Sequence, residues 1–301
     1  MKRKIAKIGP STLMVSLPSK WAKLHNLNKG DEIELTEEQN KIILTTHKNI
    51  KSTKITVDIS NLPSSLIWHY LKSTYRQGTD EIKVIFKNEK IKDRKTNQVM
   101  KTRELIQIIS DQLIGMEIIR EEKDYCILKE ISDIKEEEFE NILNRVFISL
   151  MNLVETSIEA IKNKDKETLE NIFRFTDKNI NKFTDFCFRI LNKTQHENSN
   201  SYYLIIAYLE EIGDILIRIN KKIYENFNKE LIDNYKGVGE VLKLLHKTYY
   251  RFNKDSVITF YEARDKIRSK LTKKDPTIIL MRTALSLMME VINAKITVND
   301  S

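Results

Sequence analysis

Residues 205–219 read IIAYLEEIGDILIRI, and this stretch decides the fold of the larger part of the chain. Its apolar residues recur at spacings of three and four, which places them along one face of an α-helix; they are Ile205, Tyr208, Ile212, Ile215 and Ile219. Such a stripe is typical of a helix that packs in a bundle. The same periodicity predicts six helices, at about 136–163, 165–193, 199–227, 230–251, 255–271 and 275–297. They divide into two groups of three, so we expect an internal repeat.

The composition indicates a protein of several domains that is mainly helical. A chain of 301 residues exceeds one ordinary small domain, and its low counts of glycine (7) and proline (4) favour long helices. The two cysteines, Cys126 and Cys187, are far apart and have no Cys or His at metal-ligand spacing, so neither a disulfide nor a zinc site is predicted.

The first residues do not resemble a signal peptide. Lys7, Gly9 and Pro10 interrupt the region where an apolar segment would be needed, and no later run reaches the apolar length of a membrane span. We therefore expect a cytoplasmic protein without membrane insertion.

The net charge of +8 is concentrated near the N-terminus. Residues 1–50 hold nine basic and five acidic side chains, a balance of 9 − 5 = +4, and seven lysines or arginines precede the first acid, Asp31. This distribution is typical of a surface that binds a polyanion. The alternative is a basic terminus that only increases solubility.

Turn formers and short apolar runs divide the chain into three predicted domains, at 1–50, 51–132 and 133–301. The first should hold strands at 5–8, 13–17, 32–36 and 41–46 and a short helix at 20–24 with Ser19 as its N-cap. Four strands and one helical turn bury little core, so we expect this domain to fold as a dimer. The second should be a small α/β domain with strands at 55–59, 81–86, 116–120 and 125–131, helices at 62–76 and 101–114, and a charged, mobile loop at 88–96. The third is the six-helix region.

Three segments of the first domain carry a family resemblance. Residues 3–9 (RKIAKIG), 16–21 (SLPSKW) and 27–34 (LNKGDEIE) resemble, in the same order, the AbrB/MazE/SpoVT swapped-hairpin DNA-binding family. The resemblance implies a homodimer in which two chains interlace their strands into one β-barrel that binds double-stranded DNA. The residues that it places on DNA are Arg3, Lys4, Lys7, Lys20 and Lys23. A barrel that only dimerises, without a DNA role, is the alternative.

The helical region carries a second resemblance. Residues 208–214 (YLEEIGD) are similar to the Glu-x-x-x-Asp signature of PhoU-type phosphate-signalling proteins, which consist of two three-helix repeats with metal on the bundle surface. Glu210 and Asp214 are four residues apart and opposite Ile212, so they should point outward, with Gly213 leaving space beside them. The resemblance implies a divalent or iron-type metal ion held by Glu210, Asp214 and Asp177. In the family pattern Asn181, Met281 and Leu285 replace acids. A solvated acidic face is the alternative.

No set of residues indicates catalysis. The five histidines share no ligand spacing, and no nucleophile, base and orienting group occur together in a motif. The sequence therefore predicts a non-enzymatic, DNA-binding transcriptional regulator that resembles archaeal regulators of phosphate uptake. Its bundle would sense phosphate status or bind a phosphate-transport or signalling protein. The alternative is a phosphate-signalling adaptor for a transporter or kinase, in which the N-terminal barrel serves only dimerisation.

Overall fold

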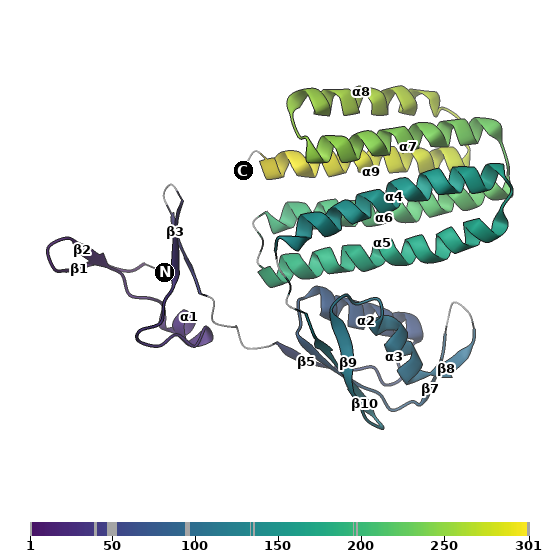
Figure 1. Ribbon diagram of the computed structural model, residues 1–301. Coiled ribbons are helices and arrows are strands. Elements are labelled where there is room, and N and C mark those ends of the chain that lie inside the picture. The colour runs from purple at the N-terminus through teal and green to yellow at the C-terminus, as the bar shows by residue number, and fades with distance from the viewer. Residues whose placement is uncertain are drawn as a thin grey trace. The chain divides into compact units, whose positions relative to one another are not determined.

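The computed structural model describes residues 2–38, 41–46, 53–93, 97–132, 134, 136–194, 196 and 198–299. Its contacts divide the chain into two compact units, Met1–Lys54 and Ile55–Ser301. Figure 1 shows the strands of the first unit and the long helices of the second.

The first unit contains two hairpins and a short helix. β1 (Ala6–Ile8) pairs with β2 (Thr12–Met14), and β3 (Glu34–Glu38) pairs with β4 (Lys41–Thr45), in two separate antiparallel sheets. The described residues of one chain form no closed barrel. Because a swapped barrel needs a second chain, that part of the expectation remains a prediction.

The connections within the first unit follow simple backbone chemistry. Gly9 has a φ of +77° in the β1–β2 turn, a conformation that favours glycine. The helix α1 (Ser19–Leu24) begins after Pro18, which occupies the N-cap position with extended backbone and without a side-chain hydrogen bond. The prediction that Ser19 caps this helix is therefore wrong, because Ser19 is its first helical residue.

The second unit begins with a four-stranded sheet in the order β5-β6-β10-β9. Its strands are β5 (Lys54–Asp58), β6 (Glu81–Ile85), β9 (Met116–Glu121) and β10 (Tyr125–Glu130). Alternate residues of the central strands are buried, as Ile82 and Val84 show, so one face of the sheet is covered. The helices α2 (Ser64–Arg76) and α3 (Thr102–Ser110) contribute Leu71 and Ile109 to the same core.

The segment expected as a loop at 88–96 contains regular structure. β7 (Lys90–Lys92) pairs with β8 (Val99–Lys101) as a small antiparallel hairpin. The expectation of a loop is therefore wrong for the described part of the segment; residues 94–96 lie outside the described residues. The prediction relied on apolar alternation to recognise strands. A two-stranded hairpin on the surface can form from charged residues without such a pattern.

The helical part follows the predicted periodicity. Its helices are α4 (Glu138–Lys162), α5 (Lys166–Thr194), α6 (Ser199–Glu225), α7 (Lys229–Tyr250), α8 (Lys254–Lys270) and α9 (Pro276–Asn299). The stripe on α6 is buried as expected, with Ile205, Ile212 and Ile219 inaccessible to solvent. α6 packs against α9, α5 and α4, and α7 packs against α8, α9 and α4 (Figure 1). Asn220 and Ser157 form a buried hydrogen bond of 3.0 Å between α6 and α4.

Within the described residues, α9 is a helix long and apolar enough to cross a membrane. Half of its most apolar window is buried inside the chain. The bundle core includes three residues of α9, Met281, Leu285 and Met288. The apolar composition of α9 is therefore that of a core helix.

Candidate functional site

The N-terminal unit presents its basic residues to solvent. Arg3, Lys4 and Lys7 are exposed, but only Lys7 lies in β1, since the strand begins at Ala6 rather than at the predicted residue 5. Lys20 and Lys23 are exposed on α1. The structure contains one chain and no DNA. The role of these five side chains as a DNA surface therefore stays a prediction.

The same unit leaves its apolar residues in solvent. No described side chain before Val57 is buried, and nine large apolar residues are exposed there: Ile5, Ile8, Leu13, Met14, Val15, Leu24, Leu35, Ile42 and Ile43. Exposed apolar residues at this density mark an interaction surface, for another protein, a membrane or a ligand. The unit therefore lacks a core of its own within the described chain.

In the second unit (Ile55–Ser301), the Glu210 carboxylate of α6 faces helix α2 of the α/β domain. The Arg76 guanidinium from α2 approaches it, with 3.3 Å between Nη2 and Oε1. Burial raises the pKa of Glu210 above its ordinary value, while the positive charge of Arg76 acts in the opposite direction. The expectation that Glu210 points outward is wrong, because α2 packs against α5 and its Arg76 reaches the Glu210 carboxylate, which is only 28% exposed.

The other predicted metal ligands are not gathered around Glu210. Asp214 is half-buried, and its carboxylate lies 3.8 Å from Arg218 on the same helix. The side chain of Asp177 lies outside the described residues. Among the described residues, no group of three or more His, Cys, Asp or Glu side chains could hold a metal ion. A cation at Glu210 would also have to displace Arg76.

Gly213 does not leave open space beside the carboxylates, so this expectation from the sequence is wrong. A Cβ atom at this position would lie 3.3 Å from side-chain atoms of both Ile180 and Leu150. Gly213 is buried, and its lack of a side chain allows α6 to pack closely against α5 and α4.

A group of charged residues that no sequence motif indicated joins α5 to α2 and to the sheet. Asp185 is fully buried and pairs with Arg76 and with Lys72, whose Nζ lies 2.8 Å from Oδ2. Arg189 is also fully buried; it donates to the carbonyl of Tyr75 at 2.8 Å and lies 3.1 Å from Glu130. Lys193 pairs with both Asp80 and Glu130. The apolar run at residues 186–191, FCFRIL, could have indicated this group. It contains Arg189, and an arginine that is buried with such a run needs a buried partner for its charge.

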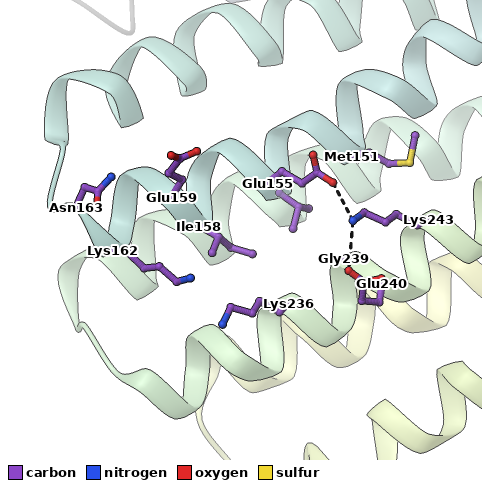
Figure 2. Close-up of a pocket in the computed structure, with 11 residues that line it drawn as sticks. Met151, Glu155, Ile158, Glu159, Lys162, Asn163, Lys236, Gly239, Glu240 and Lys243 are labelled. Atoms are coloured by element: carbon purple, nitrogen blue, oxygen red, sulfur yellow. Dashed lines mark hydrogen bonds and ion pairs between the residues drawn. The ribbon is translucent and has the colours of Figure 1, made fainter.

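A groove of about 480 Å³ lies between α4 and α7. Figure 2 shows lysines and glutamates from the two helices facing one another across it. Lys243 lies 2.9 Å from Glu155 and 3.3 Å from Glu240. The lining holds three lysines (Lys162, Lys236, Lys243) and three glutamates (Glu155, Glu159, Glu240), so its charge balances without a ligand.

Two known families match parts of the chain. Residues 7–52 match Antidote-toxin recognition MazE, bacterial antitoxin, and residues 143–223 match the PhoU domain. The second range runs from within α4, through α5, to within α6. No curated protein and no solved structure matches the chain.

These matches agree with both resemblances that the sequence motifs indicated. Both families are regulatory and non-catalytic. The first indicates DNA-binding regulation and the second phosphate-related regulation. The chain therefore carries a MazE/AbrB-type antitoxin domain at its N-terminus and a PhoU domain in its helical region.

Proposed function

We propose that this chain is a transcriptional regulator of phosphate uptake or homeostasis, in which an N-terminal homodimer binds double-stranded DNA. The PhoU-containing helical region would sense phosphate status or bind a transport or signalling partner. The observation that carries the proposal is the match of residues 7–52 to a MazE-type domain. That match falls largely within residues 1–50, which carry +4 of the chain's net charge of +8.

The chemistry of the N-terminal unit supports the DNA role. Its exposed lysines and Arg3 can neutralise phosphates and release counterions, which makes affinity strongly dependent on salt. Arg3 alone among the proposed contacts can bind guanine with two parallel hydrogen bonds. We therefore expect affinity to arise mainly from the DNA backbone and sequence preference to depend on Arg3.

The decisive experiment titrates the full-length protein with two duplexes of different sequence at several salt concentrations. If about six to ten phosphates are neutralised per dimer, affinity should fall by roughly three to five decades between about 50 and 200 mM salt. Lys20→Gln with Lys23→Gln should weaken binding to both duplexes alike and flatten the salt dependence. Arg3→Lys should instead reduce discrimination between the duplexes, because lysine keeps the charge and loses the planar fork.

The matched control removes two exposed lysines from α8, by Lys254→Gln with Lys266→Gln. It changes the net charge by the same amount and should leave the salt dependence unchanged. If the folded dimer binds no duplex at low salt, the regulator proposal fails. The adaptor function, with an N-terminal unit that only dimerises, then takes its place.

The metal predicted at Glu210 and Asp214 has a separate test, and the contact of Arg76 with Glu210 opposes it. Elemental analysis of the purified protein, before and after reconstitution with iron and divalent ions, would support metal binding only if it finds metal that Glu210→Ala with Asp214→Ala removes. Protein that stays free of metal after reconstitution would assign these residues to the contact with Arg76 and to a solvated face.

A further inference from the structure

A basic groove of about 750 Å³ lies between α8 and α9. Arg264 and Arg268 come from α8, and Arg282 comes from α9. A neighbouring depression of about 280 Å³ shares Arg268 and Arg282 and adds the hydroxyl of Ser286. The full lining of the larger groove is Tyr261, Arg264, Asp265, Arg268, Ser269, Leu271, Thr272 and Arg282.

The charge of this groove is not balanced. It holds three guanidinium groups and one carboxylate, Asp265, whereas the α4–α7 groove in Figure 2 has equal numbers of lysines and glutamates. The chain has 51 basic residues, of which only thirteen are arginine, and yet this groove is lined by three arginines and no lysine. Arginine differs from lysine in its planar fork of donors, which fits the oxygens of a phosphoryl group.

The guanidinium groups are held in place and keep unused donors. The Arg264 side chain is only 11% exposed; it lies 3.2 Å from Asp265 and over the ring of Tyr261. Its Nε is buried and has no hydrogen-bond partner among the described residues. Arg268 donates from Nη1 to Ser286 Oγ at 2.7 Å, and within the described part of the chain the Arg282 guanidinium has no ion pair. A buried donor without a partner is unfavourable until a ligand or water accepts from it.

We infer that the α8–α9 groove binds a phosphoryl group, supplied as free inorganic phosphate. The three arginines would surround the anion with donors from two helices, and Ser269 and Thr272 offer further hydroxyl donors. Asp265 supplies an acceptor for the proton on a hydrogen phosphate ion, which sulfate does not carry at neutral pH. The physiological role of this site rests on the proposed function, because bound phosphate would be the signal that the helical region senses.

The position of the site gives binding a structural consequence. α8 buries a single side chain, Phe260, and is therefore held less firmly than α4, α6 and α7, which bury many. An anion shared by Arg264, Arg268 and Arg282 would link α8 to α9. Phosphate should accordingly raise the melting temperature of the full-length protein as its concentration passes the dissociation constant.

The test measures binding of inorganic phosphate to the full-length protein by calorimetry and by equilibrium dialysis, in chloride buffer without DNA. Arg264→Gln, Arg268→Gln and Arg282→Gln, combined, should weaken binding by about ten-fold or more, because charge-assisted hydrogen bonds are lost. The control Lys266→Gln, Lys270→Gln and Lys274→Gln removes the same charge from neighbouring exposed positions and should change affinity less than about two-fold. Circular dichroism verifies that both variants remain helical. Absence of binding to the wild type, or equal binding to both variants, overturns the inference.

Further variants and ligands test whether the Ser286–Arg268 hydrogen bond is needed for binding, and they identify the source of the phosphoryl group. Ser286→Ala removes the hydrogen bond to Arg268 but keeps all three guanidiniums, so it should retain phosphate binding. Asp265→Asn should reduce discrimination against sulfate, and wild-type protein that prefers sulfate contradicts the assignment to phosphate. Binding of ADP in place of free phosphate would support phosphoryl recognition and overturn inorganic phosphate as its source. Since these measurements use no DNA, they can fail while the DNA titration succeeds, and the reverse.

Discussion

The two units of this chain use apolar residues in opposite ways. In the second unit (Ile55–Ser301, the helical unit), the apolar stripe of α6 is buried, and the buried core includes residues from Val57 to Ala294. In the N-terminal unit no described side chain is buried, and residues such as Leu13 and Ile42 are mostly exposed. The hydrophobic effect therefore stabilises the second unit from within one chain, whereas the first can gain comparable stabilisation only from a surface outside it.

Removal of residues 1–48 should have the largest effect on this contrast. The full-length chain should be a dimer and the truncated chain a monomer, because the exposed apolar residues of the hairpins are lost. The helical unit should keep its melting temperature to within a few degrees, since its core begins at Val57. Light scattering and thermal unfolding measure both quantities. A truncated chain that remains dimeric would place the dimer contact in the helical unit.

Two leucines of similar exposure should respond very differently to the same substitution. Leu13 is 66% exposed in the N-terminal unit, and Leu204 is 50% exposed on α6. Leu13→Asn should weaken the dimer by about 3–6 kcal/mol, since a side chain worth about 1.5–3 kcal/mol is lost from each of two chains. Leu204→Asn should change stability by less than about 0.5 kcal/mol. Sedimentation equilibrium and urea unfolding measure these effects, and an unchanged dimer in Leu13→Asn would contradict burial of that residue between chains.

Substitution of a buried charged residue between α2 and α5 should lower the free energy of unfolding more than substitution of a charged residue on a helix surface. Arg189→Ala removes a fully buried guanidinium from Glu130 and the Tyr75 carbonyl, at a cost of about 3–5 kcal/mol. Lys243→Ala breaks the exposed pairs with Glu155 and Glu240 and should cost less than about 1 kcal/mol. Arg189→Met keeps the volume and should be milder than alanine. Urea denaturation compares the three variants; equal losses at positions 189 and 243 would show that the buried pair is not special.

The smallest expected effect concerns Glu210. Its pKa in the folded chain is raised by burial above the ordinary value of 4.5, so the folded state binds the proton more tightly than the unfolded state. The contribution of Glu210 to stability therefore decreases as pH rises from about 4.5 through its folded pKa, and its ionised carboxylate is unfavourable above that range. Glu210→Gln should reduce this decrease. Unfolding measured across the acidic range tests the sign, and identical profiles for variant and wild type would contradict it.

Local rules are sufficient to predict much of the helical region. The spacing of Ile205, Ile212 and Ile219 predicted both the helix and its buried face. The same rules failed where partners come from elsewhere in the chain. Glu210 and Gly213 were expected at an open surface, but Arg76 lies 134 residues away in sequence and Ile180 belongs to another helix. Side-chain periodicity on one helix cannot show which of its polar positions a neighbouring element will cover.

The amino-acid sequence alone specified the six helices and the two family resemblances, because hydrophobic periodicity and short motifs are local properties. The burial of Asp185 and Arg189, the contact of Arg76 with Glu210 and the groove that three arginines from two helices share emerge only in the folded chain. Those arrangements depend on which faces of distant segments pack together. That choice follows from the burial of the whole core and not from any single stretch of residues.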